Sequence, residues 1–500
     1  MTSSNTSAAP VNTFAAPVPS RTSVALSLAL VAMSCGYDAS VSSGHTHVIA
    51  LRPDNPAAEM WRYGTDDVIE SHDSTGGAFR VHYTRDGDHA VLAADDNMNG
   101  TPDFVEDVAA HYDDALNYYV ETLGYRAPIA DSQVADNGGD SRFDVYLLDF
   151  GGSSDGAFTL DGCLVDKPSL CIGYVIQEND FAGYGYPSPA LAARIVGSHE
   201  LFHAVQAAYD RDQGGAFNEG TAVWATEAFD PSLDDFEHLV RNYLENPEAA
   251  LDRGLGYGQG LFFQFLSERF EPALIKTLLE ACEDGVGGID DPYWLHIIDG
   301  VLQAEHDENF TETFVEFATW NLYTSTHANA ALAYAHGADY APLATHRVTA
   351  PYKDNLRRFY ASTEYFSVLV DGRSSMTAAL ASTDVSELAD LHLVLAVEAN
   401  SVYTQALSFA PTEALPINTE GATRFVVGVV NTSTEEVIRR PGFCAGTPAE
   451  VANCVAEIDP SSVVEPPGRK ENNDGGCHAA PISVWAGLVV VVLLAYRRRW

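Results

Sequence analysis

The sequence predicts an α+β protein whose ordered part contains two regions of different character. Between residues 76 and 350, short alternating runs are mixed with longer segments in which apolar residues recur at helical spacing. Beyond Pro351 only short alternating runs remain, and turn residues separate them at intervals typical of a small antiparallel sandwich. We therefore expect a mixed sheet with helices over residues 76–350, followed by an antiparallel β-sandwich domain over residues 351–459.

Strands are predicted where β-branched and aromatic residues form short runs bounded by turns. In the first region these runs cover residues 79–84, 143–148 and 171–176, and in the second region residues 365–370, 391–396 and 425–430. Helices are predicted over residues 106–123, 189–209, 219–229 and 310–322, with another that opens near residue 257. The best-marked helix start is Ser188, an N-cap residue that precedes Pro189.

The helix predicted over residues 189–209 carries a His-Glu-x-x-His motif. Histidines four residues apart lie on one face of a helix, so His199 and His203 can bind the same metal ion. Glu200, next to the first histidine, can reach a water molecule on that ion. This arrangement is typical of zinc hydrolases, with Glu200 as the catalytic base. The motif alone also occurs on solvated helix faces and in packed cores.

A catalytic zinc site needs three protein ligands and one open position, so a third donor must come from another element. Glu219 and Glu227 lie on the next predicted helix, and their spacing of roughly 12 Å along it excludes both binding one ion. The His-Glu-x-x-His motif followed by Asn218-Glu219-Gly220 resembles the gluzincin metallopeptidases, the thermolysin-like and aminopeptidase group. This resemblance implies a zincin-like metallopeptidase domain in which Glu219 is the third zinc ligand.

Two further features belong to the resemblance, and two depart from it. Tyr257 and Gly260 match the Tyr-x-x-Gly of the aminopeptidase branch, which implies that Tyr257 hydrogen-bonds to the developing oxyanion; a Gly-rich turn opening a helix is the alternative. Residues 173–176 precede the metal-binding helix, where the family has an edge strand that binds extended peptide. However, Val223 replaces an Asp that orients a zinc histidine in thermolysin-like enzymes, and the Gly-x-Met-Glu-Asn element of the aminopeptidases is missing.

The reaction that the resemblance implies is hydrolysis of a peptide bond in a protein or peptide substrate. Zinc lowers the pKa of a water molecule, Glu200 removes its proton, and Glu200 then passes the proton to the leaving amine. Because the amine-gripping element is missing, we expect an endopeptidase. The alternative is a surface adhesion or binding protein with an inactive metal site, in which a carboxylate beside the ligand would have no use. Residues 79–433 as a whole resemble secreted bacterial zinc metalloproteases.

The stretch from residue 95 to residue 106 has the spacing of a calcium-binding loop. Oxygen-bearing side chains fall at positions 1, 3, 5, 9 and 12 of the loop, Gly100 supplies the tight turn, and a carbonyl completes the set. The predicted calcium ligands are Asp95, Asn97, Asn99, Thr101, Asp103 and Glu106. The alternative is a solvated Asn-Gly turn that caps the next helix.

The composition limits the partners. The chain has 70 acidic residues against 27 lysines and arginines, and its formal net charge is −43. A charge of this sign and size repels nucleic acid and anionic lipid surfaces. Nucleic acid is therefore excluded as a partner, and cations are favoured.

The N-terminal end predicts export. Residues 1–35 have the pattern of a signal peptide, because Arg21 precedes an apolar run that is short for a membrane span. The segment that ends at Cys35 also resembles a loose lipobox, and a buried helix of a cytosolic domain is a further alternative. Residues 36–75 are expected to form an N-terminal lead-in to the first domain.

The C-terminal end predicts a surface anchor. Residues 460–474 form a linker rich in Pro, Glu and Asn. Residues 475–500 combine Cys477, an apolar stretch and three arginines, and they resemble the C-terminal sorting tags of myxobacterial surface proteins, in which the Cys is the attachment point. An ordinary transmembrane anchor with positive charges inside is the alternative. Both predict association with a membrane through the tag, at the cell surface or outer membrane, with release as a further option.

Export also permits disulfides. With Cys35 and Cys477 set aside, proximity in the sequence pairs Cys163 with Cys171 and Cys444 with Cys454. Cys282 is then left without a disulfide partner.

Overall fold

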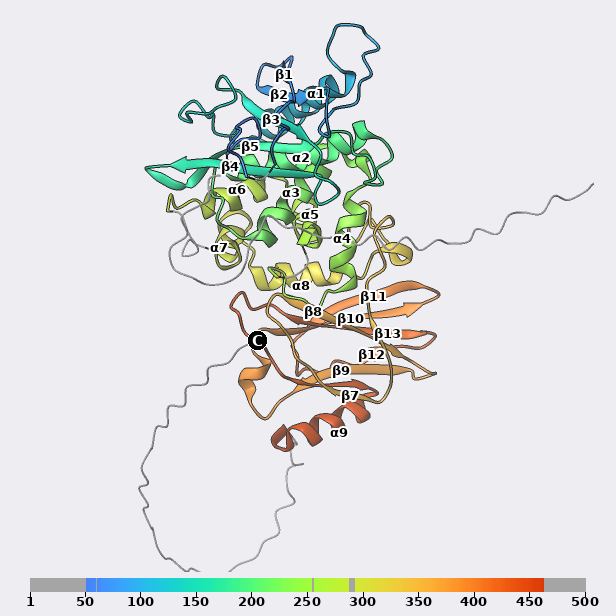
Figure 1. Ribbon diagram of the computed structural model, residues 1–500. Helices are drawn as coiled ribbons and strands as arrows, with labels where there is room; N and C mark the ends of the chain where they lie inside the picture. Colours follow the sequence, from blue (N-terminus) through green and yellow to red (C-terminus); the bar gives the residue numbers. More distant parts are fainter. Residues whose placement is uncertain (1–50, 60, 254–255, 287–292, 463–500) are drawn as a thin grey trace, which may run out of the picture.

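The computed structural model describes residues 51–59, 61–253, 256–286 and 293–462. The predicted signal peptide, the predicted C-terminal tag and all but the first three residues of the predicted linker lie outside these ranges. Within the described ranges, no helix combines the length and the apolar character needed to span a bilayer. The described chain forms an α+β structure with one mixed sheet, a group of helices and two further sheets (Figure 1).

The first sheet has five strands in the order β1-β2-β3-β5-β4. Strands β2, β3 and β5 run parallel, while the outer strands β1 and β4 pair antiparallel with their neighbours. The three strands predicted in this region are confirmed as β2, β3 and part of β5, whereas β1 and β4 were not predicted. Their bounds are β1 Ile69–Asp73, β2 Phe79–Thr84, β3 Phe143–Leu148, β4 Gly156–Leu164 and β5 Lys167–Glu178.

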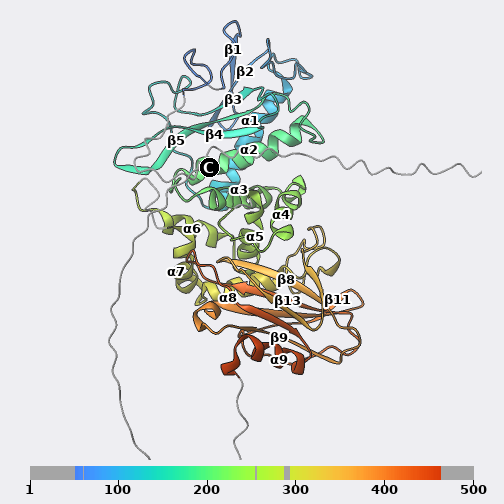
Figure 2. The same cartoon turned by 60° about the horizontal axis from the view of Figure 1, so that its bottom comes forward.

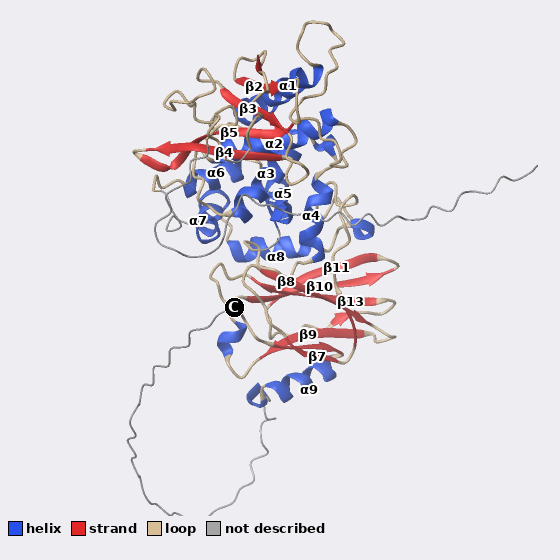
Figure 3. Cartoon of the chain, viewed as in Figure 1, coloured by secondary structure: helices blue, strands red, loops and turns tan. Residues whose placement is uncertain are grey.

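Most of the helices lie in a layer between this sheet and the two C-terminal sheets (Figure 3). The bounds are α1 Asp103–Asn117, α2 Pro189–Gln206, α3 Gly215–Phe229, α4 Phe236–Glu245, α5 Gly260–Arg269, α6 Ala273–Cys282, α7 Trp294–His306 and α8 Phe310–Trp320. Helix α2 begins as predicted, because the Ser188 hydroxyl accepts a hydrogen bond from the Leu191 N–H and Pro189 fills the first turn. Helix α1 continues into a short π-helix, Tyr118–Thr122, instead of remaining α-helical to residue 123.

The C-terminal region contains two packed sheets, of order β11-β10-β13-β8-β6 and β12-β9-β14-β7. All the pairs are antiparallel except that of β6 with β8, which is parallel, so the larger sheet is not purely antiparallel as expected. The strand bounds are β6 His346–Thr349, β7 Tyr352–Asn355, β8 Ser362–Leu369, β9 Ser375–Ala381, β10 Leu391–Ala399, β11 Val402–Phe409, β12 Ile417–Asn418, β13 Arg424–Asn431 and β14 Gly442–Gly446.

A helix that was not predicted, α9 Pro448–Ile458, covers the smaller of these two sheets (Figure 1). It begins with a capping box, in which the Thr447 hydroxyl accepts from the Glu450 N–H and the Glu450 carboxylate accepts from the Thr447 N–H. The predicted disulfides Cys163 to Cys171 and Cys444 to Cys454 are both present, and they join β4 to β5 and β14 to α9. Cys282 forms no disulfide.

Helix α8 connects the helical layer to the C-terminal sheets (Figure 2). The Tyr365 hydroxyl of β8 donates to the Ala318 carbonyl of α8 at 2.7 Å, and Tyr365, Val394 and Val426 belong to the same hydrophobic core as the helices. In addition, β6 ends just before Pro351 and already pairs with β8. The boundary at residue 350 therefore stays a prediction, and buried contacts cross it.

The N-terminal lead-in is part of the folded structure wherever it is described. Arg52 is buried, and its guanidinium forms ion pairs with three buried aspartates of the first sheet and its loops, Asp131, Asp144 and Asp161. Burial without these partners would be strongly unfavourable for a guanidinium. The segment around Arg52 is thus fixed to the sheet by charge pairing and not only by apolar contacts.

Candidate metal centre

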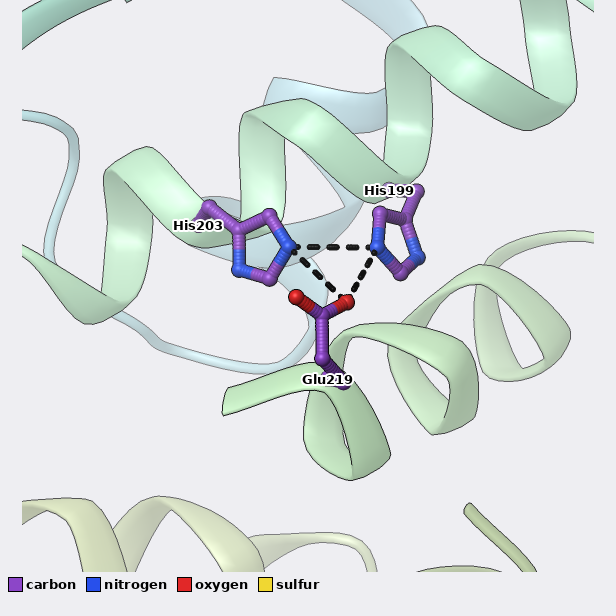
Figure 4. Close-up of side chains that lie close together, drawn as sticks. All are labelled: His199, His203 and Glu219. Atoms are coloured by element: carbon purple, nitrogen blue, oxygen red, sulfur yellow. Dashed lines mark hydrogen bonds and ion pairs between the residues drawn. The ribbon is translucent and has the colours of Figure 1, made fainter. Parts of the chain in front are cut away.

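Two facing helices bring together three of the predicted site residues (Figure 4). His199 and His203 extend from α2, and Glu219 extends from the first turns of α3. The Nε2 atoms of the two histidines are 3.1 Å apart, and the Glu219 Oε2 lies 3.2 Å from the first and 3.5 Å from the second. Among the described residues, this is the one group of three His, Cys, Asp or Glu side chains whose ligand atoms lie close enough together to share a metal ion.

The triangle formed by these atoms has the size of a metal-binding site. Zinc binds imidazole nitrogen and carboxylate oxygen at about 2.0 to 2.2 Å, so two ligands of a tetrahedral ion lie about 3.3 Å apart. The three measured separations, 3.1, 3.2 and 3.5 Å, bracket this value. The group could hold a metal such as zinc, with one position left open.

Gln206 determines which ring nitrogen of neutral His203 carries the proton. The Gln206 amide nitrogen donates to the Asn218 carbonyl and to the Thr221 hydroxyl, both at 2.7 Å, which directs the amide oxygen to Nδ1 of His203 at 2.8 Å. Neutral His203 then carries its proton on Nδ1 and presents the lone pair of Nε2 to the metal position. Gln206 therefore takes the orienting role left open by Val223, and its position three residues after His203 on the same helix face was a signal that could have identified it.

The charges of the three groups are coupled. Burial alone would lower the pKa of His203, but the carboxylate of Glu219 raises that pKa to about 9. Burial alone would raise the pKa of Glu219, but the charge of His203 and hydrogen bonds from both histidines hold it well below its usual range. The low pKa of Glu219 thus depends on a positive charge beside it, and a bound metal ion would supply the charge that a proton on His203 otherwise supplies.

Glu200 lies under the edge of the first sheet. It is 9% exposed, and its Oε2 accepts a hydrogen bond from the Phe158 N–H of β4 at 2.7 Å. Burial raises the pKa of Glu200 above its ordinary value, against the opposing charges of the two histidines. A Cβ atom at Gly156 would lie 2.9 Å from the Glu200 side chain, so the absence of a side chain lets β4 approach the motif closely. A buried carboxylate with a raised pKa is suited to accepting and donating a proton.

The position of β4 corrects the predicted substrate-binding strand. Residues 173–176 belong to β5, which is paired on both sides, with β3 and with β4. The edge of the sheet next to the metal centre is β4, which pairs only with β5 among the described strands. An extended peptide could therefore add to β4 but not to β5.

Tyr257 lies beside the metal ligands, as predicted. Its ring meets that of His199 edge to face, with 5.5 Å between the ring centroids. The following residue, Gly258, packs so closely on Tyr243 that a Cβ atom would lie 2.8 Å from the Tyr243 nitrogen. The short 3-10 turn Gly256–Gln259 is therefore held against α4, and Tyr257 with it.

Glu227, the competing third ligand, lies elsewhere. It is near the end of α3 and lines a cavity with residues of α4 and of the segment after α8. The metal group contains Glu219 and does not contain Glu227. Asp235 was not among the predicted site residues. Burial raises the pKa of Asp235, and the charge of His199 opposes this rise.

The predicted calcium loop is folded around two of its carboxylates. Both oxygens of Asp95 accept backbone hydrogen bonds, from Asn99 and Gly100, and the side-chain amides of Asn97 and Asn99 donate to the two oxygens of Glu106. Asp103 accepts from the Asp96 N–H and begins α1. The carboxylates of the loop do not form a close group of three such ligands. Calcium binding stays a prediction.

Comparisons with known proteins add little to this geometry. No protein-family model matches the chain, and no curated protein matches it. Among solved structures, it is distantly similar to aminopeptidase A of Legionella pneumophila in complex with aspartic acid, with a TM-score of 0.32 and 10% sequence identity. The match covers 71% of this chain and 36% of that protein.

Proposed function

We propose that this protein is a zinc-dependent peptidase with a zincin-like catalytic domain. The observation that supports this most strongly is the position of Glu200. Its buried carboxylate follows a ligand of the His199, His203 and Glu219 group and lies under the edge strand β4. A purely structural metal site has no need for an additional carboxylate in this place, whereas hydrolysis requires a base there.

Each residue near the centre has a role in this proposal. His199, His203 and Glu219 would hold the zinc, which when bound polarises the substrate carbonyl and lowers the pKa of a water molecule. Glu200 accepts the proton of the attacking water on its carboxylate and returns it to the leaving amine. The backbone of β4 orients an extended peptide by main-chain hydrogen bonds. The Tyr257 hydroxyl donates to the oxyanion that develops during attack.

We propose endopeptidase activity, because the amine-binding element of aminopeptidases is missing from the sequence. Quenched peptides with an acetylated N-terminus and an amidated C-terminus test this directly. We expect cleavage that is lost on treatment with a zinc chelator and restored by stoichiometric zinc. Cleavage that persists in the metal-free protein would contradict the metal mechanism, and cleavage of free N-termini alone would contradict the endopeptidase assignment.

A second function is retained as the alternative: an inactive surface adhesion or binding protein whose metal centre is structural. In this alternative the C-terminal sheets, which contribute no residue to the metal group, would contact the partner. The two proposals differ in whether the zinc-loaded protein hydrolyses any peptide.

The remaining proposals concern calcium and location. Calcium binding by the loop from Asp95 to Glu106 is supported by the spacing of its oxygen-bearing side chains in the sequence. Export to the cell surface or outer membrane, with attachment through the C-terminal tag, is supported by the sequence of the two chain ends.

A further inference from the structure

A second acidic site lies beyond the metal centre, at the end of α3. A cavity of about 350 Å³ opens there between α3, the start of α4 and the segment after α8. Its titratable lining residues are Glu227, Asp234, Glu237, His238, His336 and Asp339. Glu227 is buried and Glu237 half-buried, while the other four are exposed at the mouth. The cavity thus has a carboxylate floor and a polar rim.

The floor of the cavity lacks partners. Glu227 is 6% exposed, and its carboxylate has no hydrogen bond or ion pair with any described residue. One oxygen of Glu237, which also lines the cavity, is buried without a hydrogen-bond partner among the described residues. Buried polar groups are almost always paired, so these two carboxylates in one cavity point to a missing ligand.

The lining of the cavity favours a positively charged ligand. The cavity lining contains four carboxylates, and neither lysine nor arginine is part of it. Burial, together with the charges of Glu237 and Asp234, raises the pKa of Glu227 to about 8. A cation that entered the cavity would pair with this carboxylate and remove the electrostatic penalty of its ionisation.

The size of the cavity favours an organic cation over a metal ion. No three of the carboxylate and imidazole ligand atoms in the lining lie close enough together to surround one ion. The volume is instead within the range of about 300 to 1,000 Å³ that is typical of pockets for small organic groups. A long basic side chain fits this combination, because its apolar stem can fill the cavity while its charged end reaches Glu227.

The cavity lies close to the metal centre. Glu219 and Glu227 are eight residues apart on α3, which corresponds to about 12 Å along the helix. Asp235, next to the lining residue Asp234, lies within electrostatic reach of His199. An extended peptide advances about 3.3 Å per residue, so the cavity can receive a side chain from within about four residues of the bond at the metal.

We propose that this cavity is a specificity pocket for a lysine or arginine side chain of the peptide substrate, with Glu227 as the residue that pairs with its charge. The inference rests on the proposed peptidase function. It adds the substrate class: peptides with a basic residue near the scissile bond.

The first test measures substrate preference with the full-length, zinc-loaded protein. In a set of quenched peptides, one position at a time is lysine, arginine or norleucine, the last being an uncharged residue of similar length. For the peptide position whose side chain enters the cavity, wild type should prefer lysine to norleucine. We expect the ratio of kcat/KM for lysine to kcat/KM for norleucine to be at least about 10-fold lower in Glu227→Gln than in wild type. Glu245→Gln, an exposed carboxylate on α4 outside the cavity, should leave this ratio unchanged.

The second test does not need activity. Calorimetric titration compares the binding of Nα-acetyl-lysine amide, Nα-acetyl-arginine amide and Nα-acetyl-norleucine amide, the first two with free charged side chains. The proteins are wild type, Glu227→Gln and Glu237→Gln, and Glu237→Gln replaces Glu227→Gln if that variant does not fold. Selective binding of the basic amides that is weakened in both variants supports the pocket. If the protein shows this binding but cleaves no peptide, only the peptidase proposal is refuted. Equal binding of the basic and uncharged amides by wild type would overturn the pocket. So would calcium binding that is lost in Glu227→Gln without any preference for basic amides.

Discussion

At the scale of single residues, the metal group depends on a side chain that binds no metal. Gln206 accepts from Nδ1 of His203 while its own nitrogen donates to α3, so it fixes the histidine and joins the two helices that carry the metal group. His199, His203 and Glu200 could be predicted because helical spacing alone places them. Glu219 needed a family resemblance to distinguish it from Glu227. The Phe158 N–H that contacts Glu200 could not be predicted, since backbone contacts between distant segments leave no sequence pattern.

Replacement of Gln206 tests this orienting role. In Gln206→Met the volume is retained but the hydrogen bond to Nδ1 is lost, so His203 can rotate or change tautomer. We expect the zinc affinity to fall by about 10- to 100-fold, as is typical when the partner of a metal-bound histidine is removed. Competition with a fluorescent zinc chelator measures the change.

Two further variants separate orientation from general destabilisation. Gln206→Glu retains an acceptor for Nδ1 and should bind zinc more tightly than Gln206→Met. Gln264→Met makes the same substitution at a half-buried glutamine on α5 that is bonded to Glu268 and not to the metal group, and it should bind zinc like wild type. Equal zinc affinity of Gln206→Met and wild type would remove Gln206 from the site.

At the scale of elements, the predictions succeeded where the pattern was regular. Strands β2 and β3 have the predicted bounds, and α2 begins at the predicted residue. Strand β4 was missed because a register shift beside Gly162 breaks its alternation, and β1 was missed because it is short, polar and largely exposed. Helix α9 was missed although Thr447 and Glu450 carry a capping-box signal. Which strand forms an edge depends on pairing, and local sequence does not specify it.

The loop that precedes α1 is the element on which calcium should act. If it binds calcium, saturation at about ten times the dissociation constant adds about 1.4 kcal/mol of stability, which raises the melting temperature by a few degrees. Differential scanning calorimetry of the zinc-loaded protein, with calcium and with a calcium chelator, measures this shift.

The variant Asp95→Asn is the matched control for that loop. It removes the charge that organises the backbone of Asn99 and Gly100, and the calcium-dependent shift should disappear. Any change caused by partial loss of zinc would remain in the variant. Identical melting curves of wild type in calcium and in chelator would assign the loop to the alternative, a solvated turn before α1.

At the scale of the whole molecule, the order of a mixed sheet with helices followed by further sheets was predictable from the sequence. Near Pro351 the apolar residues change from partly helical spacing to short alternating runs. The connection between these parts was not predictable, because Tyr365 and α8 share a core through contacts that are distant in sequence. The chain thus places the candidate metal group in its N-terminal part and the proposed pocket for a basic side chain beside it. Buried contacts join its C-terminal sheets to the part that carries the metal group.

The measurement that tests the central claim most directly is peptide hydrolysis by zinc-loaded Glu200→Gln. This substitution removes the proposed base and leaves His199, His203 and Glu219 in place. We expect one zinc ion per chain in the variant and in wild type, with a rate of cleavage that is lower by about 10²- to 10⁴-fold in the variant. Equal cleavage by the two proteins, or zinc bound by both with no cleavage by either across a broad peptide panel, would contradict the proposal that this centre is a peptidase.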